Sequence, residues 1–219
     1  MSSREAILGR IRQALVDVPA TDPEADVEVA WQYGLRPDSA SEDVLGLFVE
    51  RVEDYRAVVS WVVPGELPGR IADALADHGC RSAVVPAGAP QEWHDAVAGA
   101  GIGVRTDDPV LSHAELDATG GVVTASRVGI AETGTIVLDH GPDQGRRALS
   151  LVPDVHVCVI RADQVVSDVP EAVVRLQPSI DDRQPLTWIS GPSATSDIEL
   201  SRVEGVHGPR TLHVLLVNE

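Results

Sequence analysis

Short apolar segments alternate with amphipathic segments between residues 57 and 99 of this chain. The apolar runs at 57–63 and 82–85 have the length and composition of buried strands. The segments at 66–78 and 91–98 carry apolar residues at helical spacing and end at Gly79 and Gly99. This alternation is typical of a parallel sheet with helices on both faces, so we expect an α/β fold.

The first 38 residues differ from the rest of the chain. Residues 3–16 have apolar side chains on one helical face, while 18–38 combine proline and acidic residues without clear periodicity. The next helix is expected to begin near Ser39, which stands three residues before Glu42 as in a capping box. We therefore predict an N-terminal helix and linker over 1–38 and a single α/β domain over 39–219.

Further apolar runs continue the pattern into the second half of the chain. The segments 120–126 and 130–139 are rich in Val, Thr and Ile and are separated by a short break, which favours an antiparallel hairpin. Strands are also expected at 155–160, 186–190 and 212–217, and a helix at 170–176. The last strand is apolar throughout, so it should be buried.

All 17 basic residues are arginine, and the chain has no lysine. This excludes Schiff-base chemistry, pyridoxal-phosphate anchoring and the phosphate-loop lysine, because each needs an ammonium side chain. Anion recognition must therefore use arginine side chains and backbone amides. The formal net charge of -17 argues against nucleic-acid binding, since like charges repel.

The chain has two cysteines, Cys80 and Cys158. A cysteine-ligated iron–sulfur cluster generally takes about four thiolates, so we expect no such cluster on this chain alone. No apolar run approaches the roughly 18 residues that a membrane span needs. We therefore expect a cytoplasmic protein without a membrane span.

A glycine-rich stretch after the strand at 186–190 is the first candidate binding site. It reads Gly191-Pro-Ser-Ala-Thr-Ser and precedes a helix expected to begin near Asp197. Free amides at a helix N-terminus, together with hydroxyl groups, form an anion cradle. We predict that Gly191, Ser193, Thr195 and Ser196 bind a small anion, although Ser196 and Asp197 could instead only cap their own helix.

The second candidate lies in the expected hairpin, at Glu132-Thr133-Gly134-Thr135. If Glu132 points into a cleft, desolvation raises its pKa and makes it a candidate base or nucleophile. Otherwise it faces solvent or pairs with Arg127. Thr133, Gly134 and Thr135 are candidate ligand-binding residues beside it.

Two further groups complete the candidates. Arg146 follows Gly145 after a strand, a position suited to bidentate binding of a carboxylate or phosphate. His207 lies in the turn Gly205-Val-His-Gly-Pro209 and is a ligand-binding candidate. A metal site of His207 and His213 with nearby carboxylates lacks the tight ligand spacing of known motifs, so no metal is expected.

The ordered set of motifs resembles the LUD-domain family. The resemblance is carried by Thr124, by 129–135, by Gly145-Arg146, by Leu151-Val-Pro153, by 191–199 and by 205–209, and it spans roughly residues 40–217. It implies a three-layer αβα fold with a largely parallel, mixed sheet, as in glucosamine-6-phosphate isomerase, ribose-5-phosphate isomerase and the CoA-transferases. It also implies a role in oxidising L-lactate to pyruvate together with two iron–sulfur partner proteins.

The resemblance leads to one main expectation and two alternatives. The main expectation is a non-redox subunit with a small-anion pocket, which binds no cofactor of its own because the clusters belong to the partners. The first alternative is a stand-alone CoA-transferase-like or phosphosugar-isomerase-like enzyme that uses Glu132. Thr133 stands where the CoA-transferases have the asparagine of a Glu-Asn-Gly turn, and the lysine common in the isomerases is absent. The second alternative is a metabolite-sensing docking module.

Overall fold

A computed structural model describes residues 3–16, 43–192 and 208–218, and the chain divides into two compact units, 1–33 and 34–219. The described part of the first unit contains helix α1 (Ser3–Ala14), as its periodicity predicted. Ile7, Ile11 and Leu15 are exposed on this helix and just after it. The predicted linker falls almost entirely outside the described residues.

The second unit is built on a six-stranded sheet in which all neighbouring strands are parallel. Its order is β1-β10-β7-β4-β2-β3. The strands are β1 (Val58–Val62), β2 (Ser82–Val84), β3 (Gly103–Arg105), β4 (Gly121–Thr124), β7 (Val155–Arg161) and β10 (Thr211–Val217). The C-terminal strand β10 inserts between β1 and β7, which explains why it is apolar and buried throughout.

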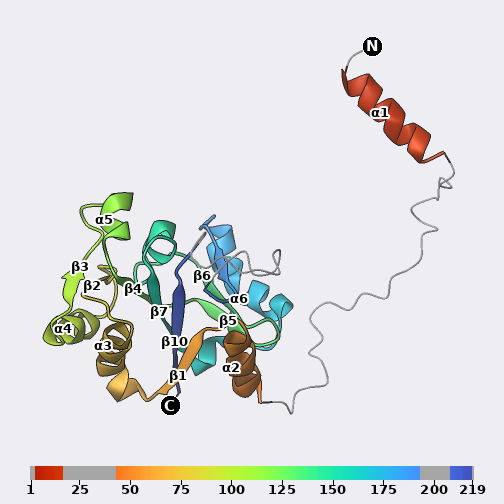
Figure 1. Ribbon diagram of the computed structural model, residues 1–219. Coiled ribbons are helices and arrows are strands. Elements are labelled where there is room, and N and C mark those ends of the chain that lie inside the picture. Colours follow the sequence, from red (N-terminus) through yellow and green to blue (C-terminus); the bar gives the residue numbers. More distant parts are fainter. Residues whose placement is uncertain (1–2, 17–42, 193–207, 219) are drawn as a thin grey trace. The chain divides into compact units, whose positions relative to one another are not determined.

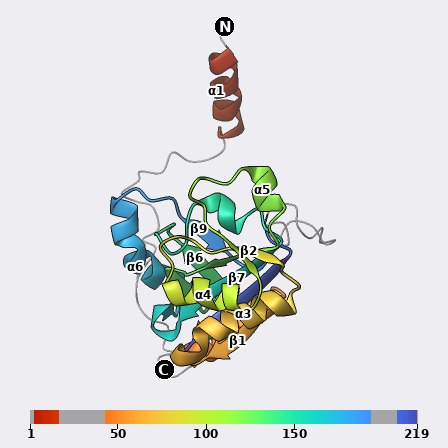
Figure 2. The same ribbon diagram turned by 90° about the vertical axis from the view of Figure 1, so that its left-hand side faces the viewer.

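Helices α3 (Leu67–Asp77) and α4 (Gln91–Gly99) cover one face of this sheet (Figure 1). Viewed from that side, both helices lie in front of the strands (Figure 2). Leu75 of α3 and Trp93 of α4 pack in one core cluster with Val157 and Leu215 of the central strands. Alternate residues along β7 and β10 therefore face these two helices.

The opposite face is covered by helix α2 (Val44–Asp54) and by a second sheet of four strands, in the order β8-β5-β6-β9. These strands are β5 (Val128–Ile130), β6 (Thr135–Leu138), β8 (Val165–Val166) and β9 (Thr187–Ile189). Phe48 of α2 and Leu138 of β6 pack with Ile160 of β7. Helix α6 (Val169–Asp181) packs on the far side of the second sheet through Leu176.

Short elements complete the unit. Helix α5 (His113–Asp117) and the 3-10 turn η3 (Arg147–Ser150) cover the sheet beside β2 and β4 through Leu116 and Leu149. Two more 3-10 turns, η2 (Pro64–Glu66) and η4 (Ala162–Gln164), follow the carboxyl ends of β1 and β7. The α/β class and the largely parallel central sheet are as predicted, whereas the second sheet is additional to the single sheet expected.

The predicted hairpin of 120–126 with 130–139 is wrong. Residues 121–124 form β4, which lies between β2 and β7 in the parallel sheet and is buried on both faces. The actual hairpin is made by β5 and β6. Glu132 therefore lies in the connecting turn and not in a strand.

Candidate functional site

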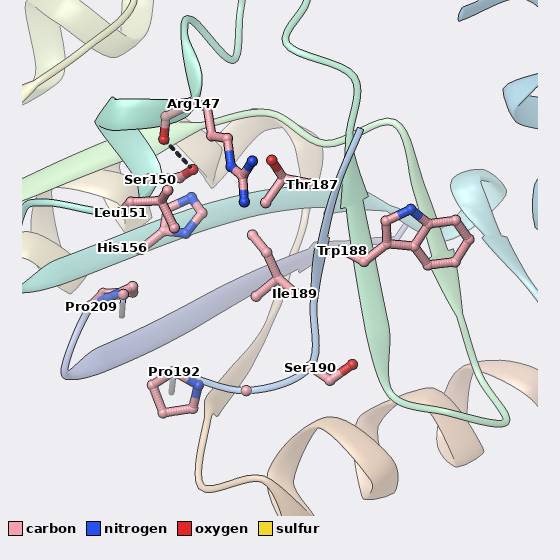
Figure 3. A pocket seen from close by; sticks show the side chains of 12 residues that line it. Arg147, Ser150, Leu151, His156, Thr187, Trp188, Ile189, Ser190, Pro192 and Pro209 are labelled. Carbon is pink, nitrogen blue, oxygen red and sulfur yellow. Dashed lines mark hydrogen bonds between the residues drawn. The ribbon is translucent and has the colours of Figure 1, made fainter. Parts of the chain in front are cut away.

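A cavity of about 430 Å³ opens between β9, η3 and the amino-terminal ends of β7 and β10. Its volume lies within the range of small-molecule sites. Five polar side chains of the described residues line it: Arg147 and Ser150 from η3, His156 from β7, Thr187 from β9, and Ser190, which follows β9 (Figure 3). Because β9 alternates, Thr187 and Ile189 point to the cavity side while Trp188 points the other way (Figure 3).

Thr187 is held in place by a histidine from the neighbouring loop. The Nδ1 atom of His140 donates to the carbonyl oxygen of Gly145 at 2.9 Å, and its Nε2 lies 2.8 Å from Oγ1 of Thr187. In the neutral ring Nε2 is then an acceptor, so the Thr187 hydroxyl donates to it. The free lone pairs of Thr187 are left for a ligand that donates a hydrogen bond.

The loop that leads to Arg147 is fixed by the buried carboxylate of Asp139. This carboxylate accepts hydrogen bonds from the Ser179 hydroxyl at 2.7 Å and from the Gln144 side-chain amide at 2.8 Å. It also forms an ion pair with Arg127 at 3.4 Å. The Gln144 oxygen in turn accepts from the backbone amides of Asp139 and His140. The loop before η3 is therefore held at several points, which limits the positions open to Arg147.

His156 is fully buried at the wall of the cavity. Burial lowers its pKa to about 4, so the ring is neutral near pH 7. Nε2 lies 2.8 Å from the Thr124 hydroxyl, while Nδ1 has no partner among the described residues. When Thr124 donates to Nε2, the ring proton sits on Nδ1, and a ligand oxygen in the cavity would satisfy this donor.

Arg147 is the only charged side chain among the described residues of the cavity wall, because His156 is neutral. Its guanidinium points toward Thr187, across from Ser150 and His156 (Figure 3). The Ser150 hydroxyl donates to the Arg147 carbonyl oxygen at 3.2 Å. The described wall thus offers one cation, the neutral ring of His156 and the hydroxyl groups of Ser150, Thr187 and Ser190, a set that suits a small carboxylate carrying a hydroxyl group.

Both described ends of the second glycine motif lie at this cavity. Gly191 and Pro192 line it from one side, and Gly208 and Pro209 from the other. A Cβ atom at Gly208 would be 3.1 Å from the Pro192 carbonyl oxygen, so the two ends lie against each other. Four of the predicted ligand-binding residues lie between them, outside the described residues: Ser193, Thr195, Ser196 and His207.

The first motif adjoins the cavity but does not line it. Glu132 is exposed in the β5–β6 turn and, with Thr133, lines a separate hollow of about 290 Å³. A chain of hydroxyl contacts connects the two places: Thr133 to Thr135 at 2.7 Å, and Thr135 to Ser190 at 2.8 Å. Gly134 has a left-handed backbone in the same turn. The structure therefore brings the two motifs together through hydroxyl groups, with Glu132 to one side.

Arg146 is engaged elsewhere. It donates to both carboxylate oxygens of Asp107, at 2.6 and 3.1 Å, and to the Leu111 carbonyl oxygen at 2.6 Å. Burial by itself would raise the pKa of Asp107, but the hydrogen bonds from Arg146 and the Leu111 amide outweigh it and leave the pKa lowered. Arg146 thus anchors the 107–111 loop, and its neighbour Arg147 is the arginine that reaches the cavity.

His213 lies on the opposite face of the sheet, away from the cavity. Its Nε2 is 2.9 Å from Ser60 Oγ and its Nδ1 is 3.1 Å from His78 Nε2. Burial, with the nearby His78, lowers its pKa to about 4. Among the described residues no cluster of three or more His, Cys, Asp or Glu side chains could hold a metal ion, and His207 lies outside them.

The sequence interpretation missed four of the five polar wall residues among the described residues and named the neighbour of the fifth. His156 had one usable signal, since it is the single polar residue between Val155 and Ile160. Ser150 and Thr187 resemble many other hydroxyl residues of the chain. Arg147 differs from Arg146 only in which way it points, and local sequence does not encode that direction.

This fold and cavity define the chain as a member of the LUD-domain family, whose model, described as LUD domain, matches residues 103–217. The matched segment contains β9, η3, β7 and β10, which together form the cavity. Lactate utilization protein C of Deinococcus radiodurans is 53% identical over 97% of this chain and 90% of its own length. Lactate utilization protein C of Bacillus pumilus is 26% identical over 100% of this chain and 98% of its own length.

A solved structure agrees with the fold. The crystal structure of a DUF162 family protein from Deinococcus radiodurans matches with a TM-score of 0.68 and 48% identity. The match covers 80% of this chain and 96% of that chain. In the part of the chain that the structure describes, no helix is long and apolar enough to cross a membrane.

Proposed function

We propose that this chain is the non-redox subunit of an L-lactate utilization system and that the cavity between β9, η3 and β7 binds the small carboxylate. Two lines support the proposal. Relatives that match nearly the whole chain are named lactate utilization protein C. Among its described residues the cavity carries one cation beside hydroxyl oxygens, and the proposal rests chiefly on this observation.

The polar groups suit a 2-hydroxy acid in a definite orientation. The carboxylate would accept from the Arg147 guanidinium and from Nδ1 of His156, the two donors of the wall. The 2-hydroxyl group would donate to Thr187, whose own proton is directed to His140. Each ligand oxygen thereby meets a group of the opposite hydrogen-bonding kind.

The two electrons released when L-lactate becomes pyruvate would be taken up by partner proteins. Both cysteines of this chain are buried, and burial raises the pKa of both thiols, that of Cys158 to about 12. A cysteine-ligated iron–sulfur cluster generally takes about four thiolates, more than this chain has. We therefore assign the clusters to two iron–sulfur partner proteins, and the carboxylate site to this subunit.

Catalysis by Glu132 would take place outside this cavity, in the separate hollow that Glu132 lines. The carboxylate of Glu132 is exposed beside Arg51 and Asp54, in the separate hollow. A CoA-transferase-like or isomerase-like enzyme would have to use that hollow, whereas the buried donor and the lining arginine belong to the larger cavity. The geometry therefore favours carboxylate binding over catalysis by Glu132.

Growth on L-lactate tests the proposal in the native host. A strain that lacks this gene should fail to grow on L-lactate, and the wild-type gene should restore growth. Arg147→Gln should not restore it, while Arg81→Gln, an exposed arginine away from the cavity, should. Lactate-dependent growth of the deletion strain at the wild-type rate would overturn the proposal.

A further inference from the structure

A second cavity, of about 600 Å³, lies at the carboxyl ends of four strands of the parallel sheet. Pro64 follows β1, Val217 ends β10, Arg161 ends β7 and Ser126 follows β4, and all four residues line it. In open parallel α/β sheets, ligands bind in crevices outside the carboxyl ends of the strands. Its position is therefore that of a ligand site.

This cavity is separate from the carboxylate site. On β7 the first cavity includes His156 and the second includes Arg161, five residues further along the strand. At about 3.3 Å per residue His156 and Arg161 are ~16 Å apart, and Val159, the residue of β7 in the second cavity nearest to His156, is ~10 Å from it. The first cavity includes Pro209, which precedes β10. The second cavity includes Val217, the last residue of β10. None of the described residues lines both cavities.

Trp93, one of the residues that line this cavity, carries a buried donor without a hydrogen-bond partner among the described residues. Its side chain is 4% exposed, and the donor atom is the indole Nε1. A buried donor left unpaired is unfavourable, because it has lost its hydrogen bonds to water. A ligand atom that accepts this hydrogen bond would remove the cost, and a buried indole donor of this kind needs a specific explanation.

The charged residues of the wall are mostly acidic. Glu92, Asp143 and Asp163 face a single cation, Arg161, which is already paired with Asp163 at 3.0 Å. Burial, together with nearby Asp139, raises the pKa of Asp143, so a further negative charge there is unfavourable. The cavity therefore disfavours anions, in contrast to the carboxylate site.

Two other polar side chains of the wall beside β7, those of Ser126 and Gln164, already form hydrogen bonds within the protein. Ser126 donates to the Val159 carbonyl oxygen at 2.9 Å, and the Gln164 amide donates to the Ser126 carbonyl oxygen at 2.8 Å. The Gln164 side-chain oxygen accepts from the Arg161 amide at 2.8 Å. The groups left for a ligand are the carboxylates of Glu92 and Asp143, which accept hydrogen bonds, the side-chain amide of Asn218, which donates and accepts them, and the indole of Trp93, which donates one.

We propose that this second cavity binds an uncharged ligand that carries several hydroxyl or amine donors and an acceptor atom, of the size and kind of a nucleoside. Ribose hydroxyl groups would donate to the carboxylates of Glu92 and Asp143. A ring nitrogen or hydroxyl oxygen would accept from Trp93. Apolar walls formed by Leu67, Pro90 and Val217 would contact the base.

Isothermal titration of the purified full-length chain with adenosine tests this inference. Adenosine should bind saturably at one site, and ADP more weakly, because its phosphates meet the acidic wall. Trp93→Phe, which keeps the ring but removes the donor, should weaken adenosine binding about tenfold, and so should Asp143→Asn. Glu92→Gln, at an exposed position where folding is not at risk, should weaken it several-fold.

The controls separate this inference from the carboxylate proposal. Glu66→Gln, an exposed carboxylate of η2 outside the cavity wall, should bind adenosine as the wild type does. Arg147→Gln should also keep full adenosine affinity, whatever its effect on lactate. Absence of saturable adenosine binding, or equal affinity in the wild type and the Trp93, Asp143 and Glu92 variants, would overturn the inference.

Discussion

Arg146 and Arg147 are adjacent in the chain, yet their surroundings assign them different tasks. Arg146 is two-thirds buried and donates three hydrogen bonds to the 107–111 loop. Arg147 is exposed at the cavity. Arginine beside glycine after a strand predicted an anion site at Arg146, whereas Arg147 is the side chain that reaches the cavity because of the turn that η3 makes.

Replacing Arg146 should therefore lower stability. In Arg146→Gln, Asp107 loses its paired cation while it is still largely buried, and the free energy of unfolding should fall by about 1–3 kcal/mol. Arg147→Gln removes an exposed side chain, so its stability should stay within about 0.5 kcal/mol of the wild type. Urea unfolding of the two variants measures both values, and equal stability of the two would contradict these assignments.

His156 should make stability depend on pH. Its pKa is about 4 when folded, against about 6.5 when unfolded, so below pH 6.5 the unfolded chain takes up a proton that the folded chain does not. Stability is thus lost as pH falls from about 6.5 toward 4. By linkage the loss at pH 4.5 is about 2–3 kcal/mol.

His156→Asn removes the titrating group and shows whether the loss comes from this residue. Its free energy of unfolding should fall less than that of the wild type between pH 7 and pH 4.5. His213, whose pKa is also lowered to about 4, leaves part of the dependence in the variant. Parallel pH profiles of the variant and the wild type would show that the buried ring is not the cause.

At the scale of helices and strands, the turn between β5 and β6 depends on glycine. Gly134 has a φ of 57°, and a Cβ atom there would lie 2.6 Å from the backbone carbonyl carbon of Arg51 in α2. Gly79 has a φ of 71°, but a Cβ atom there would meet nothing within 4 Å. The two positions share the left-handed backbone and differ only in the space around them.

The two glycines form a matched pair of substitutions. Gly79→Ala should cost about 1 kcal/mol, the penalty of a left-handed alanine. Gly134→Ala should cost about 2 kcal/mol more, because α2 must move away from the turn. Thermal unfolding gives the comparison, and a Gly134→Ala variant as stable as Gly79→Ala would show that α2 and the turn are not in close contact.

Local pattern predicted most helices and strands but not their pairing. The strands at 155–160 and 212–217 and the helices at 66–78 and 91–98 are present close to the predicted bounds. The run 120–126 is apolar and short, and such a run suits either a hairpin or a buried parallel strand. Its actual partners, β2 and β7, lie some 35 residues away on either side, and no local signal identifies them.

The second sheet could not be predicted from the sequence for a similar reason. Its edge strand β8 has two residues, Val165 and Val166, too few for any periodicity. The sheet forms because Leu138 and Ile136 of β6 and Val165 of β8 can pack on the face of the central sheet. Such packing depends on tertiary contacts, which outweigh local preference.

For the whole molecule, the proposed carboxylate site is assembled from three separate segments. η3 and β7 supply residues near 150, β9 supplies residues near 188, and the approach to β10 supplies residues near 208. The sequence indicated two of these segments through their glycines, because glycine marks positions where the backbone needs unusual freedom. The third segment includes β7, whose sequence has the pattern of an ordinary core strand. Only the fold shows that His156 faces a cavity.

The likeness to phosphosugar isomerases and CoA-transferases stays a prediction at this scale. The parallel sheet and its helices are compatible with that class, but the second sheet and α6 form additional layers on one face. The N-terminal unit contributes a helix with an exposed apolar face. The described residues that line the two cavities all belong to the second unit.

Calorimetric titration of the purified chain with L-lactate tests the carboxylate site most directly. The wild type and Arg81→Gln should bind lactate at one site with equal affinity. Arg147→Gln should bind it at least about tenfold more weakly, because a charge-assisted hydrogen bond contributes about 1.5–3 kcal/mol. Equal lactate affinity in Arg147→Gln and the wild type, or no binding by either, would contradict the assignment of this cavity to the carboxylate.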